Sequence, residues 1–199
     1  MPSAHNSAHA SDPNDVASLV PLTVWPTPTA TTPGVLSPGV AARLIATFSK
    51  PGDRVLALDG PAGYADAAGY LHRPYTARPA AAVLAGDTPT GPVGLVIDHP
   101  PAAPAEQLLA RFATVARLLT GGGFLACVHP PAAGPRDPLA TAIGAGEAAG
   151  LRYLQHLVAL AVPIRHGTLT PPRDATTGGL LTAVHTDVAV FTTPGGDRA

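Results

Sequence analysis

SPGVAARLIATFSKPGDRVLALDGPAG, residues 37–63, passes from a helix through a tight turn into a short apolar strand. Ser37 can cap the helix, and Pro38 suits its first position because no helical hydrogen bond is lost there. The apolar residues that follow recur at helical spacing, and residues 51–53 (PGD) end the helix. The apolar run 55–60 (VLALDG) then ends in Asp and Gly, and a second helical pattern comes next. This order predicts the start of a unit in which strands and helices alternate.

The rest of the chain continues this alternation as far as a closing strand. Its apolar runs lack the period of a one-sided sheet, which indicates strands that are buried on both faces. Strands that alternate with helices predict a mostly parallel, doubly wound α/β sheet. We expect strands over 80–85, 93–98, 124–130, 151–164 and 184–193, and helices over 62–73, 105–119 and 138–149, with the glycines 121–123 ending the helix before them.

The two least regular stretches set the expected domain boundaries. Residues 1–20 are rich in Ser, Ala, Asn and Asp and show no hydrophobic periodicity, so we expect a disordered N-terminal tail. We assign residues 21–199 to one domain. Within it, the polar stretch 165–183 contains Pro and Gly and is predicted to be a loop and a candidate mobile insertion.

Composition limits the kinds of protein that this chain can be. Of its 199 residues, 46% are hydrophobic but only 5% are aromatic, so the core must be built from Ala, Val and Leu. The single Cys127 excludes an internal disulfide framework and fits a reducing compartment. The sequence contains neither a membrane-spanning apolar run nor a secretory signal. We therefore expect a soluble, cytoplasmic domain with no membrane partner.

The charge balance disfavours duplex DNA as a partner. The chain contains 12 Lys and Arg residues and 13 Asp and Glu residues, which gives a formal net charge of −1 at pH 7. Proteins that bind nucleic acid usually carry a basic excess or a basic stripe, and this chain contains no run of basic residues. The balance favours a small molecule or another protein instead.

Polar side chains follow three of the expected strands. Asp59 ends the first strand, the pair Asp98 and His99 ends another, and His129 follows a third. Ligands of doubly wound sheets bind outside the carboxyl ends of the strands, so these residues form the predicted site. The loop after Asp59, residues 60–63 (GPAG), lets backbone approach a ligand, because glycine leaves room there. The alternative is that Asp59 and Gly60 are only a strand-ending turn.

Other kinds of site find less support in the sequence. The prolines after His99 could hold the strand end rigid and present a carboxylate or a carbonyl, or could simply stop the strand. His99 and His129 could form a composite metal site, although no HExxH or H-x-x-x-H pair occurs and a single cysteine excludes thiolate zinc sites. The chain contains no GxSxG sequence, so acyl transfer has no support from a motif. It contains no GxGxxG sequence either, so a dinucleotide site has none.

Residues 37–63 resemble class I S-adenosylmethionine-dependent methyltransferases, in particular DNA amino-methyltransferases. In that family a helix leads through a Pro-Gly-Asp turn into a strand that ends Asp-x-x-x-Gly, which Asp59 and Gly63 match. Residues 98–101 (DHPP) fall where the family has its catalytic Asp/Asn/Ser-Pro-Pro-aromatic tetrapeptide. The resemblance covers about 24–194 and includes the Gly-rich turn and strand GGGFLACVHPP, residues 121–131, and the closing strand pair 148–164 and 185–194.

This resemblance implies a Rossmann-like class I methyltransferase sheet, mostly parallel with an antiparallel closing strand and shortened in the middle. It implies S-adenosylmethionine as cofactor and makes duplex DNA a possible methyl acceptor, whereas the charge balance favours a small-molecule or protein acceptor. The residues that it assigns to cofactor binding are Asp59, Gly60, Ala62, Gly63 and Asp87. Asp87 is the nearest candidate for the acid that binds the cofactor ribose in the family. The residues that it assigns to catalysis are Asp98, His99, Pro100 and Pro101.

The sequence also departs from the family pattern. Pro61, Ala62 and Tyr64 stand in the normally Gly-rich cofactor loop, and Ala102 replaces the aromatic residue that stacks on a flipped base. These losses define the alternative hypothesis, a catalytically inactive methyltransferase-fold module that binds or scaffolds a partner. A nucleotide-binding Rossmann oxidoreductase is a third hypothesis, which the missing GxGxxG sequence disfavours.

Overall fold

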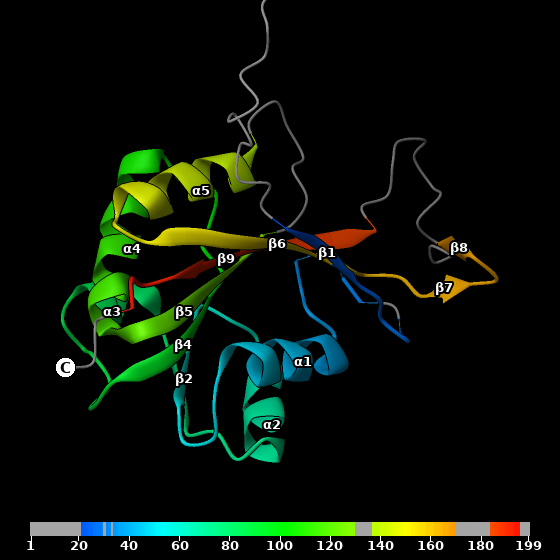
Figure 1. The fold of residues 1–199 in the computed structure, drawn as a ribbon, viewed down its shortest axis with the longest axis horizontal. Coiled ribbons are helices and arrows are strands. Elements are labelled where there is room, and N and C mark those ends of the chain that lie inside the picture. Colours follow the sequence, from blue (N-terminus) through cyan, green and yellow to red (C-terminus); the bar gives the residue numbers. More distant parts are fainter. Residues whose placement is uncertain (1–20, 30, 33, 130–136, 170–183, 196–199) are drawn as a thin grey trace, which may run out of the picture.

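A computed structural model describes residues 21–29, 31–32, 34–129, 137–169 and 184–195. Its centre is a seven-stranded sheet with the strand order β1-β6-β9-β5-β4-β2-β3, covered by helices on both faces (Figure 1). Strand β9 runs antiparallel to β5 and β6, and every other pair in this sheet is parallel. The prediction of a doubly wound, mostly parallel sheet with an antiparallel closing strand is therefore confirmed. The predicted tail, residues 1–20, lies outside the described residues.

The described elements follow one another along the chain as strands and helices in near-regular alternation. The strands of the main sheet are β1 Leu22–Trp25, β2 Arg54–Leu58, β3 Tyr75–Arg78, β4 Val93–Asp98, β5 Leu119–His129, β6 Arg152–Leu160 and β9 His185–Thr192. The helices are α1 Pro38–Phe48, α2 Gly63–Tyr70, α3 Ala80–Leu84, α4 Ala105–Leu118 and α5 Pro138–Ala148. A small separate hairpin consists of β7 Ile164–Arg165 and β8 Thr168–Leu169.

Residues 37–63 fold as their sequence predicts. Ser37 Oγ accepts a hydrogen bond from the Val40 amide, and Pro38 opens α1. Gly52 takes a φ of +87°, a conformation that glycine adopts without a steric penalty, and so allows the tight turn into β2. Strand β2 is buried along four of its five residues, and α2 returns the chain to the α1 side of the sheet.

Two predicted elements differ from the structure around the middle of the chain. The prediction of a strand over the apolar run 80–85 is wrong, because these residues form the short helix α3. Strand β3 was not predicted, since its sequence YTAR has no apolar run. It forms by pairing with β2 along its whole length. Between β2 and β4 the chain forms only α2, β3 and α3, with a single strand among them, which agrees with the expected shortening in the middle.

Differences also occur at the ends of longer elements. Helix α4 ends at Leu118, and β5 begins at once and includes the three glycines that were expected to end the helix. A register shift between Val93 and Leu95 lets β5 pass these glycines beside β4. The predicted strand 151–164 is shorter, ending at Leu160, and part of the predicted loop 165–183 forms the β7–β8 hairpin. Residues 170–183 of that loop lie outside the described residues.

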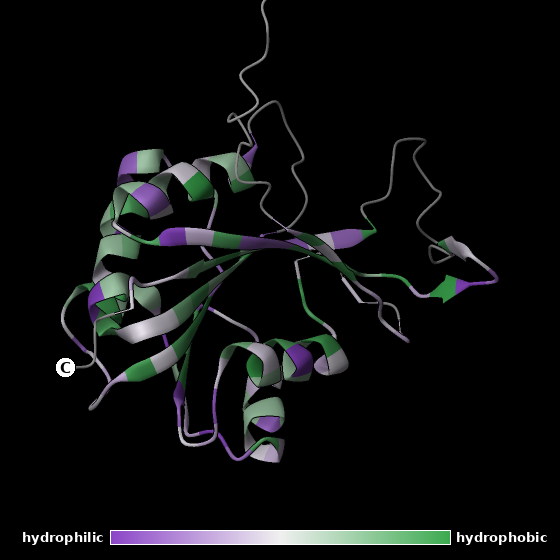
Figure 2. Ribbon diagram, viewed as in Figure 1, coloured by the Kyte–Doolittle hydropathy of each residue, from purple (hydrophilic) through white to green (hydrophobic). Residues whose placement is uncertain are grey.

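Two apolar layers enclose the sheet. One lies beneath α1 and α2 and includes Trp25, Leu44 and Ile45, and the other lies beneath α3, α4 and α5 and includes Phe112 and Phe191. Figure 2 shows the central strands as mostly hydrophobic, as expected for a sheet that is buried on both faces. Most buried apolar residues are Ala, Val, Leu and Ile, close to what composition predicts.

Candidate functional site

Asp59 occupies the carboxyl end of β2 in a strained backbone conformation. Its φ is +52°, which is uncommon for a residue other than glycine. Its Oδ1 accepts a hydrogen bond of 3.0 Å from the amide of Ala80, the first residue of α3. Residues are held in such conformations mainly where surrounding contacts fix them, and they cluster at functional sites. Asp59 therefore remains the central candidate residue of this edge.

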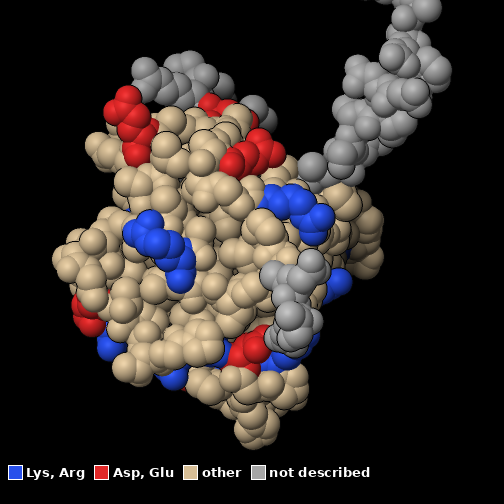
Figure 3. All heavy atoms as spheres, turned by 60° about the vertical axis from the view of Figure 1, so that its left-hand side comes forward, with Lys and Arg blue, Asp and Glu red and all other residues tan. Residues whose placement is uncertain are grey.

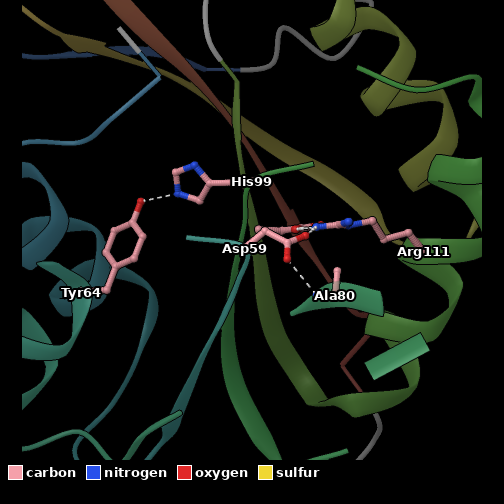
Figure 4. A network of polar contacts seen from close by, with 6 residues as sticks. Asp59, Tyr64, Ala80, His99 and Arg111 are labelled. Atoms are coloured by element: carbon pink, nitrogen blue, oxygen red, sulfur yellow. Dashed lines mark hydrogen bonds and ion pairs between the residues drawn. The ribbon is translucent and has the colours of Figure 1, made fainter. Parts of the chain in front are cut away.

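Arg111 joins Asp59 to Asp98 across the end of the sheet. Its Nε donates to Asp98 Oδ2 at 2.8 Å, its Nη2 bonds to Asp98 Oδ1, and the same Nη2 donates to Asp59 Oδ2 at 3.0 Å. The Asp98 side chain is 0% exposed and that of Arg111 is 10% exposed. Figure 4 shows Asp59 between Arg111 and Ala80. Two carboxylates thus share one guanidinium, and Asp98 is enclosed by the protein.

Burial and ion pairing shift the pKa values of Asp98 and Arg111 in opposite directions. Burial raises the pKa of Asp98 above its usual value, and the Arg111 guanidinium opposes that shift. Burial alone would lower the pKa of Arg111, but the two carboxylates outweigh it and raise that pKa overall. A charge that is buried without a partner would be strongly unfavourable, so each member of the trio depends on the others.

Sequence reasoning missed Arg111, although a signal for it exists. Arg111 lies on the same face of α4 as Leu108, Phe112 and Val115, which are all buried. An arginine within an apolar stripe is rarely buried without a charged partner. Its partners stand 13 and 52 residues away, so the pattern signals a buried ion pair but does not name the carboxylates.

Tyr64 and His99 form a second polar contact beside Asp59. Tyr64 Oη and His99 Nε2 lie 2.7 Å apart, and Tyr64 is fully buried. A Cβ atom added to Gly60 would lie 3.0 Å from the Tyr64 ring and 3.3 Å from His99, so both rings fill the space beside this loop residue. The pKa of His99 is lowered to about 4, mainly by burial and to a smaller extent by the nearby His129. Burial also raises the pKa of Tyr64. Both groups are therefore neutral near pH 7.

A cleft of about 440 Å³ opens beside Asp59. It lies between the carboxyl ends of β2 and β3 and is lined by Ala57, Asp59, Gly60, Ala77, Arg78 and Pro79. Asp59 is the acidic side chain of this lining, and its side chain is 39% exposed. Asp87, the candidate for a ribose-binding acid, instead lies 3.6 Å from Arg78 Nε in an exposed ion pair.

The remaining predicted site residues lie around this edge without meeting in one cluster. Ala62 precedes α2 and Gly63 opens it, and neither belongs to the cleft lining. Pro100 is buried and Pro101 exposed just beyond β4. His129 ends β5, is 3% exposed, and its Nε2 has no hydrogen-bond partner among the described residues.

The described residues hold no group of three or more His, Cys, Asp or Glu side chains that could bind a metal ion. The hypothesis of a composite metal site at His99 and His129 therefore gains no support from them. Within the same ranges, no helix is long and apolar enough to cross a membrane. On the face shown in Figure 3, positive and negative side chains are both present among many uncharged ones.

No protein-family model and no curated protein matches this chain. Among solved structures it is similar to a TehB-like SAM-dependent methyltransferase from Corynebacterium glutamicum, with 15% identity, 77% of this chain and 86% of the other covered, and a TM-score of 0.42. It is also similar to the N-methyltransferase NodS from Bradyrhizobium japonicum (11% identity, 79% and 94% covered, TM-score 0.44). TrmN from Thermus thermophilus matches as well (18% identity, 79% and 49% covered, TM-score 0.42). The chain thus has methyltransferases among its structural neighbours, at low identity, and its fold class rests on its own strand order.

Proposed function

We propose that this chain binds S-adenosylmethionine in the cleft beside Asp59 and transfers its methyl group to a small-molecule or protein acceptor. The observation that carries the proposal is the position of the cleft. It opens at the carboxyl ends of β2 and β3, where ligands of doubly wound sheets bind, and its wall contains Asp59 and Gly60. These two residues also begin the loop that resembles the cofactor loop of class I methyltransferases.

The residues present fit such a ligand in two respects. Asp59 supplies a partly exposed carboxylate that can accept hydrogen bonds from an ammonium or hydroxyl group. Gly60 adds no side chain at the point where Tyr64 and His99 already approach, so the loop stays close-packed. Ala62 and Gly63 extend the loop toward α2. The cofactor, when bound, supplies an electrophilic methyl group.

In this proposal His99 orients the acceptor by a hydrogen bond rather than taking up its proton. Burial lowers the pKa of His99 to about 4, so the imidazole is neutral near pH 7 and too weak a base for efficient proton uptake there. In the tautomer whose Nε2–H donates to Tyr64, the second ring nitrogen, Nδ1, has no hydrogen-bond partner among the described residues and can accept a hydrogen bond from the methyl acceptor. We assign Asp98 the role of anchoring the strand end rather than touching the acceptor, because its carboxylate is enclosed and paired with Arg111. Pro100 and Pro101 would hold His99 at the rim of the sheet.

Charge supports a small molecule or a protein as the acceptor over duplex DNA. The formal net charge is −1, and the face in Figure 3 carries both signs of charge. Duplex DNA binding draws most of its affinity from an excess of positive side chains that contact phosphates. The aromatic residue that a base-flipping enzyme needs is replaced by Ala102.

Calorimetry with S-adenosylmethionine and S-adenosylhomocysteine tests the proposal directly. We expect binding by the wild-type protein and a loss of at least tenfold in affinity for Asp59→Asn, since asparagine tolerates the left-handed backbone but carries no charge. Asp66→Asn, an exposed acid in α2, is the matched control and should bind like the wild type. No binding by the wild type at millimolar ligand contradicts the proposal, and unchanged binding by Asp59→Asn contradicts the site.

A catalytically inactive module is the second candidate, and one observation favours it. The rings of Tyr64 and His99 occupy the space beside Gly60, and Arg111 already pairs with both carboxylates of the strand ends. A chain with this role would fold and bind a partner without affinity for the adenosyl ligands. The same calorimetry separates the two candidates, because only the methyltransferase proposal requires that affinity.

A further inference from the structure

The carboxylate of Asp59 is held on one side and open on the other. Ala80 N–H and Arg111 Nη2 each donate to one of its oxygens, both at 3.0 Å. A carboxylate offers about four acceptor positions, so these two donors use about half of them. The side chain is 39% exposed and lines the cleft, which leaves the remaining positions available to a ligand there.

Two contacts hold the Asp59 side chain in its position. Its φ of +52° is uncommon for a residue other than glycine, although aspartate adopts it more readily than most, and contacts with neighbouring groups stabilise it there. The Ala80 amide is one such group, and it belongs to the first residue of a helix of only five residues. Arg111 is the other, and it comes from the 14-residue helix α4.

Arg111 is itself rigidly placed. Two of its nitrogens bond to the two oxygens of Asp98, an arrangement that fixes both the position and the plane of a guanidinium. Asp98 is fully enclosed at the end of β4, and β4 pairs with β2 along the residues that lead to Asp59. The position of Asp59 relative to the cleft is thereby tied to the core of the sheet.

We propose that Arg111 is a positioning residue for the cleft, which directs the free acceptor positions of Asp59 toward hydrogen-bond donors of the ligand. The inference rests on the proposed function, in which those donors are ammonium or hydroxyl groups of the cofactor. Arg111 does not touch the ligand itself, because its side chain is 10% exposed and does not line the cleft. Its effect passes through Asp59.

The double variant Asp98→Leu/Arg111→Met removes the buried ions together. Replacement of a buried ion pair by apolar residues of similar size often leaves stability unchanged, whereas removal of one partner does not. We expect this variant to fold with a wild-type circular dichroism spectrum and to bind S-adenosylhomocysteine at least tenfold more weakly. Unchanged or tighter binding by the folded variant would overturn the inference, since a merely structural Arg111 has no further effect once the fold is intact.

Amide hydrogen exchange without ligand gives a second readout. The Ala80 amide donates to Asp59 Oδ1 and opens α3, so its protection reports where Asp59 lies. We expect its exchange to be at least tenfold faster in the double variant. The Val83 amide, which donates to the Pro79 carbonyl at 3.3 Å, is the internal control and should not change. Faster exchange at Ala80 supports positioning even if the wild type binds no adenosyl ligand, so failure of the proposed function can be distinguished from failure of this inference.

Arg111→Lys covers the case in which the double variant does not fold. Lysine keeps the positive charge but lacks the fork that reaches two carboxylates at once. We expect weaker S-adenosylhomocysteine binding and faster Ala80 exchange than in the wild type. Arg117→Lys, an exposed position on the same helix whose Nη2 bonds to Thr114, should change neither. Wild-type binding and Ala80 protection in Arg111→Lys would overturn the inference.

Discussion

Tyr64 Oη and His99 Nε2 are hydrogen-bonded at 2.7 Å, and this contact links the first turn of α2 to the residue that follows β4. The two rings are tilted by 46° and their centroids lie 5.6 Å apart, beside the glycine that begins the loop after Asp59. Both rings approach Gly60, which lines the cleft, but neither ring lines the cleft itself.

Tyr64→Phe should lower the free energy of unfolding by about 1 kcal/mol, within the range of about 0.5–3 kcal/mol for a hydrogen bond that leaves a buried group unsatisfied. The ring and its packing stay the same, so the change isolates the hydroxyl. Urea denaturation measures the effect. Tyr70→Phe in the same helix removes a hydroxyl from a side chain that is 81% exposed and should have no effect. Equal stability of the Tyr64→Phe protein and the wild type would show that the contact contributes nothing.

The low pKa of His99 predicts a pH dependence of stability with a definite sign. Burial lowers its pKa from 6.5 in the unfolded chain to about 4 in the folded one, so the unfolded chain binds more protons between these values. Stability is therefore complete above about pH 6.5 and falls as the pH drops toward 4, by at most roughly 3 kcal/mol for a shift of this size. The pKa of His129 is lowered by burial as well and acts in the same direction.

Urea denaturation between pH 4 and pH 7 checks this dependence. His99→Gln should flatten the curve relative to the wild type, because the substituted side chain does not titrate. His72→Asn, at an exposed position with a φ of +54° that asparagine tolerates, should leave the slope as it is. An unchanged slope in His99→Gln would contradict the assignment of the dependence to His99.

The sequence allowed the carboxyl ends of the strands to be found, because apolar runs that end in Asp or His mark where buried strands reach the sheet edge. Asp59 and His99 are at the site for that reason. The partners of these residues could not be predicted in the same way. Arg111 reaches Asp59 across 52 residues of sequence, and only the packing of α4 against the sheet brings them together.

The errors in secondary structure have related causes. Residues 80–85 (AAAVLA) form a short apolar run, and such a run has no period that separates a buried strand from a helix. Strand β3 was missed for a different reason. Its sequence YTAR carries no apolar run, and the strand depends on backbone pairing with β2. Strand β1, between prolines, likewise depends on its parallel pairing with β6. Pairing with a distant segment of the chain thus determined both strands, whereas α3 forms from a local run whose pattern is ambiguous.

Arg111→Ala should destabilise the protein by about 3–5 kcal/mol, because it leaves Asp98 buried without its counter-ion. Arg78→Ala is the matched control. Arg78 pairs with Asp87 at 3.6 Å between side chains that are 41% and 61% exposed, and exposed pairs of this kind contribute at most about 1 kcal/mol. Chemical denaturation of the two variants should give clearly different midpoints. A loss below 1 kcal/mol in Arg111→Ala would mean that Asp98 is neutral or solvated in the folded protein.

Two glycines in α5 should respond oppositely to alanine. A Cβ atom at Gly146 would lie 2.5 Å from the ring of Phe191, a fully buried residue of β9 whose ring centroid lies 6.1 Å from that of Phe112 in α4. Gly146→Ala should therefore destabilise the protein by about 1–3 kcal/mol, despite the helix propensity of alanine.

Gly144→Ala supplies the comparison within the same helix. A Cβ atom there meets nothing within 4 Å, so alanine adds no contact and removes only backbone freedom from the unfolded chain. We expect a gain of about 0.5–1 kcal/mol. Thermal and urea unfolding of both variants measure the contrast. If Gly146→Ala were as stable as Gly144→Ala, α5 would have to lie farther from β9 than the packing against Phe191 requires.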